Sequence, residues 1–138
     1  RVSIFPPRLM GRKSLNNSHL LPSIVGSIYS EVGQAICSSQ PILTGIGIRA
    51  LIESICKEKD ACGHNLEIKI DDLLAKGFLT KAKAEILHGL IFMGNDAAHE
   101  GKPHKIETLS LALEIVESLL LDVYILPQLA NKEFKQRK

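Results

Sequence analysis

The segment Gly-Asn-Asp-Ala-Ala-His-Glu at residues 94–100 contains the residue types in this sequence that are best suited to chemistry. If the segment is helical, Asn95 and His99 are four residues apart and share a face. Imidazole can transfer protons near neutral pH, and a neighbouring Asn could orient the ring or bind a phosphate oxygen. The spacing alone favours a structural role, in which Gly94 would end a helix, Asn95 would hydrogen-bond freed backbone groups, and His99 would satisfy a buried partner.

Arg49 is the second candidate, because it is the only arginine between Arg12 and Arg137 and stands in a strongly apolar segment. A guanidinium pairs carboxylates or phosphates in a forked geometry. Glu53, four residues later, is the internal partner, and a buried Arg49–Glu53 pair would tether helices. In the functional alternative, Arg49 points with His99 at an anionic substrate.

Two arrangements of these residues therefore stay open. One is a structural polar network, and its members are Arg49, Glu53, Asn95 and His99. The other is a catalytic group of His99 as general acid and base, Asn95 as its orienting residue and Arg49 as the phosphate ligand.

The other candidate groups favour no chemistry of their own. The cysteines are Cys37, Cys56 and Cys62, an odd number without a Cys-x-x-Cys pair, which favours a reduced, cytoplasmic location. Cys56, Cys62 and His64 could supply three metal ligands, but their spacing matches no common zinc pattern. We therefore expect no metal and no cofactor, and we expect Asp71 and Asp72 to lie on a solvated helix face.

Composition limits the class of protein. The chain has 138 residues, of which 45% are hydrophobic and 23% charged, as in one ordinary globular domain. No apolar run approaches the ~18–20 residues of a membrane span, and no signal peptide opens the sequence. The first residue is not Met, which leaves open that the chain is part of a longer protein.

The charge distribution divides the chain into three parts. Residues 1–20 form an irregular segment with four basic residues and no acid, and residues 131–138 form a basic tail. Residues 21–130 carry a net negative charge, so the body lacks the broad cationic face of most nucleic-acid binders.

Hydrophobic periodicity predicts helices over about 22–37, 42–59, 65–75, 80–93 and 106–126. Short connections between them favour an all-α, five-helix antiparallel bundle. Gly45 and Gly47 indicate either close approach of a neighbouring helix or a later helix start. We expect Gly94 to kink or end the fourth helix, and Pro127 to stop the last one or kink it into a short tail.

The last helix is apolar on more than one side, which predicts a partner subunit. Its main stripe lies along Leu109, Leu113, Val116 and Leu120, among others, and the residues outside that stripe are Leu111, Ile115, Leu121 and Ile125. We therefore expect a homodimer through this helix or through the Asn95–His99 region.

Several segments together resemble a bacterial family of helical domains that are often appended to restriction and phage-defence proteins. They are residues 22–32, 47–56, 65–73, 94–100 and 112–124, in that order. That family is grouped with the HEPN superfamily of helical nucleotide-binding domains. The resemblance covers about residues 20–130 and identifies residues 21–130 as a HEPN-like helical domain.

The resemblance implies a helical bundle that often dimerises. Active HEPN members are metal-independent endoribonucleases that use an Arg, four to six further residues and a His. His99 matches that His and Asn95 matches the polar residue that often follows the Arg, but positions 92, 93 and 94 hold Phe92, Met93 and Gly94.

The sequence therefore favours a non-catalytic interaction and dimerisation module in bacterial nucleic-acid surveillance or phage defence. Its partners would be a second copy and an RNA or a defence-system protein, and no membrane. The alternative is a metal-independent ribonuclease or RNA-binding domain that uses His99 with Asn95 and Arg49.

Overall fold

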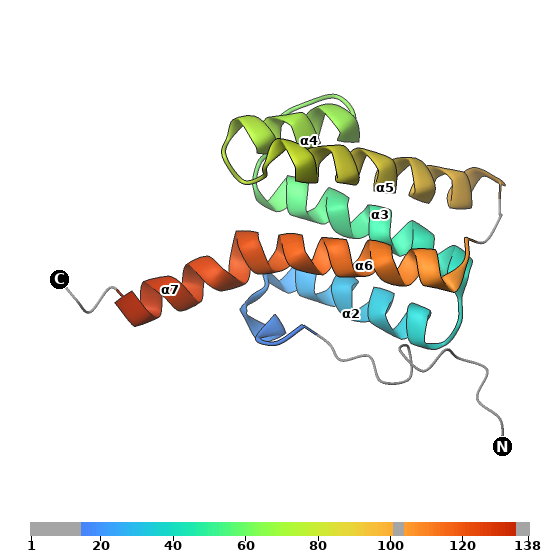
Figure 1. The fold of residues 1–138 in the computed structure, drawn as a ribbon, viewed down its shortest axis with the longest axis horizontal. Coiled ribbons are helices and arrows are strands. Elements are labelled where there is room, and N and C mark those ends of the chain that lie inside the picture. Colours follow the sequence, from blue (N-terminus) through green and yellow to red (C-terminus); the bar gives the residue numbers. More distant parts are fainter. Residues whose placement is uncertain (1–14, 101–103, 135–138) are drawn as a thin grey trace, which may run out of the picture.

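The computed structural model describes residues 15–100 and 104–134, with the side chains of residues 93–100 outside that description. A short 3-10 turn, η1 (Ser18–Leu20), precedes α2 (Ser23–Cys37), α3 (Pro41–Glu58), α4 (Leu66–Ala75), α5 (Lys81–Glu100) and α6 (Ile106–Leu120). A π-helical turn, η2 (Leu121–Ile125), then leads into α7 (Leu126–Phe134). The predicted all-α bundle of five main helices is confirmed (Figure 1).

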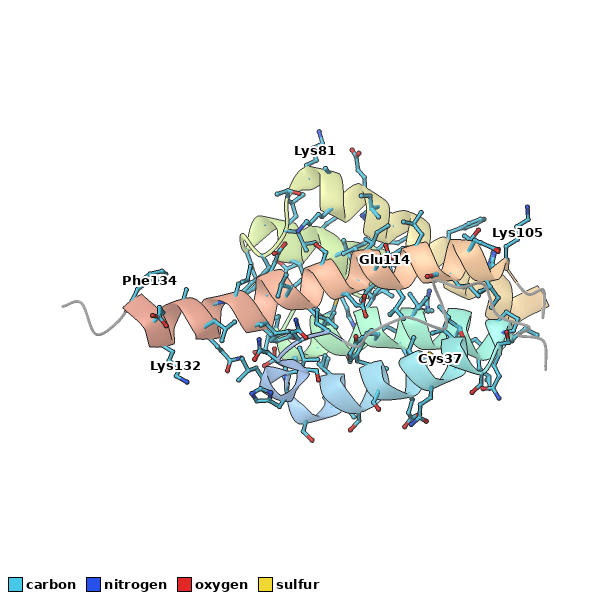
Figure 2. The ribbon with its side chains drawn as sticks, turned by 60° about the horizontal axis from the view of Figure 1, so that its bottom comes forward. Cys37, Lys81, Lys105, Glu114, Lys132 and Phe134 are labelled. Carbon is cyan, nitrogen blue, oxygen red and sulfur yellow. The ribbon has the colours of Figure 1, made fainter. Side chains whose placement is uncertain are left out.

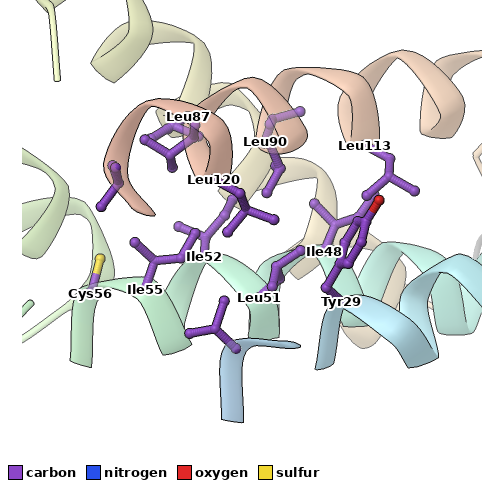
Figure 3. Packing of buried hydrophobic residues seen from close by; sticks show 14 of the residues in the cluster. Tyr29, Ile48, Leu51, Ile52, Ile55, Cys56, Leu87, Leu90, Leu113 and Leu120 are labelled. Carbon is purple, nitrogen blue, oxygen red and sulfur yellow. The ribbon is translucent and has the colours of Figure 1, made fainter. Parts of the chain in front are cut away.

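Helix α3 is the centre of the bundle, because it packs against α2, α4, α5 and α6. Ile48, Leu51, Ile52 and Ile55 recur at spacings of three and four residues along it, and all four are fully buried. Figure 3 shows these side chains meeting Leu87 and Leu90 of α5 and Leu113 and Leu120 of α6. Each such side chain contributes about 1.5–3 kcal/mol on burial, so the aliphatic core accounts for the fold without Trp.

The expected role of Gly47 is confirmed at the crossing of α2 and α3. A Cβ built on Gly47 would lie 2.7 Å from Cγ2 of Val32. Val32 is β-branched and stiff, so it cannot move aside cheaply. The absence of a side chain at Gly47 therefore sets how closely the two helices approach, and α3 begins at Pro41 rather than later.

The predicted ends of α4 and the start of α5 are confirmed. Oδ1 of Asn65 accepts a 2.8 Å hydrogen bond from the Ile68 N–H, and Oγ1 of Thr80 accepts one of 3.2 Å from the Lys83 N–H. Gly77 lies two residues after Ala75, the last residue of α4, and has φ of 88°, a conformation that costs a glycine little.

Of the two expectations for Pro127, a stop of the last helix or a kink into a short tail, the stop is wrong, because the chain continues as α7. In a regular α-helix the Pro127 ring would clash with the carbonyl one turn earlier, and Pro127 has no N–H to donate. The chain avoids this clash by widening into the π turn η2, in which the Leu126 N–H reaches the Leu121 carbonyl. Helix α7 then continues beyond the rest of the bundle (Figure 1), so residues 131–134 of the predicted tail are helical.

The Gln128 side chain holds this junction in place. Its Nε2 donates to the Tyr124 carbonyl at 2.8 Å and to the Leu20 carbonyl of η1 at 2.9 Å. One amide group thus joins the π turn, the start of α7 and the N-terminal turn.

Candidate functional site

The backbone of α5 is one helix through the candidate segment. Of the expected kink or end at Gly94, the end is wrong, because α5 runs to Glu100. Asn95 and His99 therefore stand one helical turn apart, as the spacing argument requires. Their side chains lie outside the described residues, so their hydrogen bonds and their roles stay predictions.

Arg49 lies in the middle of α3 and forms the predicted pair with Glu53, but the pair is not buried. The distance from Nη2 of Arg49 to Oε2 of Glu53 is 3.6 Å, and the two side chains are 27% and 51% exposed. Both residues belong to α3, so the pair does not tether two helices. The expectation of a buried, helix-tethering pair is corrected: the helix turns Glu53 toward solvent.

The two terminal nitrogens of the Arg49 guanidinium have different surroundings, because Nη2 lies near Glu53, whereas Nη1 pairs with none of the described residues. Nη1 is buried and has no hydrogen-bond partner among the described residues. A buried donor without a partner costs about 1–3 kcal/mol. Arg49 therefore retains hydrogen-bonding capacity on the helix that packs against α5.

The structure brings the helices of the candidate residues together. Helices α3 and α5 lie side by side and run in opposite directions (Figure 1). Arg49 and Glu53 are in contact, whereas contact of either residue with Asn95 or His99 is not described. Phe92, one turn before Asn95 and the first of the three positions where active HEPN members carry Arg, is 75% exposed.

The prediction that Asp71 and Asp72 lie on a solvated helix face did not include the partners that each carboxylate has in the structure. Oδ1 of Asp71 lies 3.0 Å from Nε2 of His88 on α5. Oδ2 of Asp72 accepts a 2.8 Å hydrogen bond from the Cys62 N–H and lies 3.1 Å from Nζ of Lys76. The Cys62 hydrogen bond, and after it the one from Lys76, lower the pKa of Asp72. The four-residue spacing to Lys76 was visible in the sequence, but the loop and α5 partners were not.

A second cluster, of Lys59, Phe78 and Tyr124, lies at the C-terminal end of α3. Nζ of Lys59 lies 5.2 Å from the centre of the Phe78 ring and 4.9 Å from that of Tyr124, which are cation–π distances. The Tyr124 hydroxyl is buried, and no hydrogen bond of acceptable geometry reaches it among the described residues. Burial, and then the neighbouring Glu58 carboxylate, raise the pKa of Tyr124. Lys59, Phe78 and Tyr124 are far apart in the sequence, and no regular spacing of residues predicts that they are in contact.

The possible metal ligands do not form a centre in the described part of the chain. Cys56 is buried in the core, whereas Cys62 is exposed. Across residues 15–92 and 104–134, no three His, Cys, Asp or Glu side chains gather closely enough to hold a metal ion.

A hollow with a volume of about 710 Å³ lies between α2 and α3. We call it the α2–α3 groove. Its walls are mostly aliphatic, and its lining residues are Ile28, Glu31, Val32, Gln34, Ala35, Ser38, Gln40, Leu43, Ile46, Gly47 and Ala50. The sequence analysis did not find this groove, because it arises where two helices meet at Gly47.

The predicted second apolar face of the last helix is largely covered by the chain itself. Ile125 is buried, Ile115 and Leu121 pack against the core, and only Leu111 is exposed. The apolar surface that this face exposes is therefore smaller than the pattern predicted.

No helix within the described residues has the length and apolar character needed to cross a membrane.

Comparison with known proteins gives one match. No curated protein and no solved structure matches this chain. One family model, described as "Domain of unknown function (DUF4145)", matches residues 30–137, from the second turn of α2 to beyond α7. Since that match covers most of the sequence, the chain belongs to the DUF4145 family.

Proposed function

We propose that the chain is a HEPN-like, non-catalytic interaction and dimerisation module of a bacterial nucleic-acid-surveillance or phage-defence protein, acting in the cytoplasm. The observation that carries the proposal is the exposed aromatic ring of Phe92. It stands where the resemblance to HEPN nucleases calls for a cation, and the other two such positions hold Met93 and Gly94.

Charge supports a non-catalytic role. Cleavage of RNA by its own 2′-hydroxyl builds negative charge on the non-bridging phosphate oxygens, and a cation beside His99 would stabilise it. Loss of such a group costs about 3–4 kcal/mol, by analogy with removal of one oxyanion-hole donor. That cost lowers the rate about 100-fold to 1,000-fold. The net negative body also disfavours RNA.

Exposure of Phe92 supports an interaction role. Aromatic side chains are enriched at the centres of protein interfaces, where burial of their large surface stabilises the complex. A ring that is 75% exposed retains most of that surface for a partner. The proposed partners are a second copy of the chain and a protein of the same defence system.

A nuclease assay tests the non-catalytic part. The full chain, wild type and His99→Ala, is incubated with mixed RNA with and without a chelator. We expect no cleavage by either protein. Chelator-resistant cleavage that disappears in His99→Ala would overturn the proposal.

Sedimentation equilibrium of the same protein tests dimerisation. We expect a mass of two chains at micromolar concentration. A single-chain mass over the whole accessible range contradicts the dimer.

A metal-independent ribonuclease or RNA-binding domain is the second candidate function. The partly exposed side chain of Arg49 favours it, because a guanidinium that solvent reaches could bind phosphate. In this case His99 would act as acid and base, with Asn95 orienting it. Weaker RNA binding by Arg49→Gln than by wild type, at one fixed salt concentration, would support this candidate over the first.

A further inference from the structure

A hollow with a volume of about 380 Å³ lies along α2, on the side where this helix meets α6. It is lined by Ser18 and by residues of α2 from Gly26 through Tyr29 and Gly33 to Cys37. We call it the α2 hollow. A Cβ built on Gly33 has nothing within 4 Å among the described residues. The middle of the hollow is therefore open to a further segment of chain or to a partner.

The chain that leads into α2 runs along this hollow. Cβ of Leu21 lies 3.7 Å from a Cβ built on Gly26, and the Leu15 N–H donates a 2.8 Å hydrogen bond to the hydroxyl of Tyr29. Followed backward from Leu21 to Leu15, the chain therefore takes the direction in which α2 runs (Figure 1).

Helix α6 borders this path with carboxylates. The Tyr29 hydroxyl that binds Leu15 also donates a 2.5 Å hydrogen bond to Oε2 of Glu117. Helices α2 and α6 lie side by side and run in opposite directions, so Glu114, about one turn before Glu117, is level with the turn of α2 that follows Tyr29. Glu114 is exposed, and Figure 2 shows it on α6, with Cys37 at the end of the neighbouring α2.

Residues 1–14, which lie outside the described residues, carry the opposite charge. They contain no acidic residue, and their basic residues are Arg1, Arg8, Arg12 and Lys13. Complementary charge selects one partner over others, so the acidic border of the α2 hollow favours this segment. Because Leu15 is already bound, the segment also has a high effective concentration at the hollow, which a separate molecule would lack.

An extended chain spans the required distance. One turn of α2 is about 5.4 Å long, and an extended chain covers about 3.3 Å per residue. Arg12 and Lys13 thus come beside Glu114 when the chain continues from Leu15 along α2. Consecutive side chains of an extended chain point to opposite sides, so one of these two basic groups can face α6 whichever way the segment is turned.

We propose that residues 1–14 bind in the α2 hollow of their own chain, with Arg12 or Lys13 paired to Glu114 of α6. This contact goes beyond the proposed function and does not depend on a dimer. It gives the basic N-terminal segment an acidic surface of its own domain as its partner, in place of a phosphate.

Limited proteolysis of the full chain by trypsin tests the contact, because a bound segment is cleaved after Arg12 and Lys13 only when it leaves the hollow. Gly33→Leu places a side chain in the hollow and should raise the cleavage rate at these two sites about tenfold or more. Gly89→Leu on α5 is the matched control, because a Cβ built there also has nothing within 4 Å among the described residues. It should leave the rate within about threefold of wild type. Equal rates in the two variants would overturn the proposal.

Charge reversal tests the acidic border. Glu114→Lys should raise the same cleavage rate at low ionic strength, and the difference from wild type should shrink in about 1 M salt, which screens exposed charges. Glu85→Lys, exposed on α5, makes the same change in net charge and should have no effect. An equal effect of both variants would be a response to net charge alone and would contradict the pairing with Glu114.

A nitroxide label tests the position of the segment directly. Cys37 and Cys62 are both exposed, so each can carry the label when the other is replaced by Ser. In the NMR spectrum, a label on Cys37 should broaden the amide signals of residues 8–14. A label on Cys62, in the loop between α3 and α4, should not broaden them. Equal broadening by both labels, or by neither, contradicts the proposed position.

Dilution separates binding within one chain from binding between two copies. We expect the cleavage rate at Arg12 to be independent of protein concentration. Protection that is lost on dilution would place the segment on a second copy and overturn binding within one chain. A monomeric protein with a protected Arg12 would overturn the proposed dimer and keep this inference. Circular dichroism of each variant shows that faster cleavage is not lost folding.

Discussion

The hydroxyl of Tyr29 on α2 donates a 2.5 Å hydrogen bond to Oε2 of Glu117 on α6, 88 residues later in the chain. The same hydroxyl accepts a 2.8 Å hydrogen bond from the Leu15 N–H. One buried phenol oxygen thus connects two helices and the N-terminal segment, beside the aliphatic core (Figure 3).

Removal of that hydroxyl should destabilise the fold. Tyr29→Phe removes the hydrogen bonds to the Glu117 carboxylate and from the Leu15 N–H, at an expected cost of about 1–3 kcal/mol in urea unfolding. Tyr124→Phe is the matched control, because the Tyr124 hydroxyl has no hydrogen bond among the described residues. The control should be neutral or stabilising, and equal losses in both variants would contradict the argument.

Gly47→Ala should destabilise the crossing of α2 and α3. The added methyl group would meet Val32 at 2.7 Å, and overpacking costs about 1–3 kcal/mol. Gly89→Ala on α5 is the control, because nothing lies within 4 Å of a Cβ built there. That variant should gain about 0.4–1 kcal/mol. Thermal melting of both variants measures the difference, and a stabilised Gly47→Ala would refute the close approach.

Glu53→Ala should cost less than about 1 kcal/mol, because its pair with Arg49 is solvent-exposed and screened. A buried pair would instead lose about 3–5 kcal/mol. The measurement is urea unfolding at low and at high salt. A large, salt-independent loss would restore the buried-pair interpretation.

The Asp72 carboxylate should stabilise the fold in a pH-dependent way. Its pKa is below the ordinary 3.8, first through the Cys62 N–H and then through Lys76. Its charged form is therefore favoured in the folded state, and its contribution is present above pH 3.8 and lost as the pH falls through the lowered pKa. The stability difference between wild type and Asp72→Asn should vanish in acid.

The three cysteines should differ in reactivity. Cys37 and Cys62 are exposed, whereas burial raises the pKa of Cys56 to about 11. A thiol reagent at pH 8 should modify the two exposed residues quickly and Cys56 only after unfolding. Rapid modification of Cys56 in the folded protein would contradict its burial.

The same thiol predicts a loss of stability in alkali. The folded state holds the Cys56 proton more tightly than the unfolded chain, whose thiol pKa is 9.0. The stabilisation is complete below pH 9 and is lost as the pH rises from 9 through 11. Urea unfolding from pH 8 to 10.5, compared with Cys56→Ala, measures this slope.

The sequence by itself determined the helices and most of their core-facing residues. Apolar spacing of three and four residues depends only on helix geometry, so Ile48, Leu51, Ile52 and Ile55 could be assigned without neighbours. The caps at Asn65 and Thr80 and the stop at Gly77 could be read in the same way, because each acts on backbone groups within a few residues.

Tertiary structure decided the rest. Gly94 did not end α5, since one glycine costs a helix only about 1 kcal/mol, which packing against α3 can offset. The sequence showed that Arg49 and Glu53 can meet but not that they meet in solvent, because exposure depends on which helices cover α3. The Tyr29–Glu117 hydrogen bond, the contacts of Lys59 with two aromatic rings and the α2–α3 groove join residues of different elements. Such contacts depend on helix packing, which local spacing does not encode.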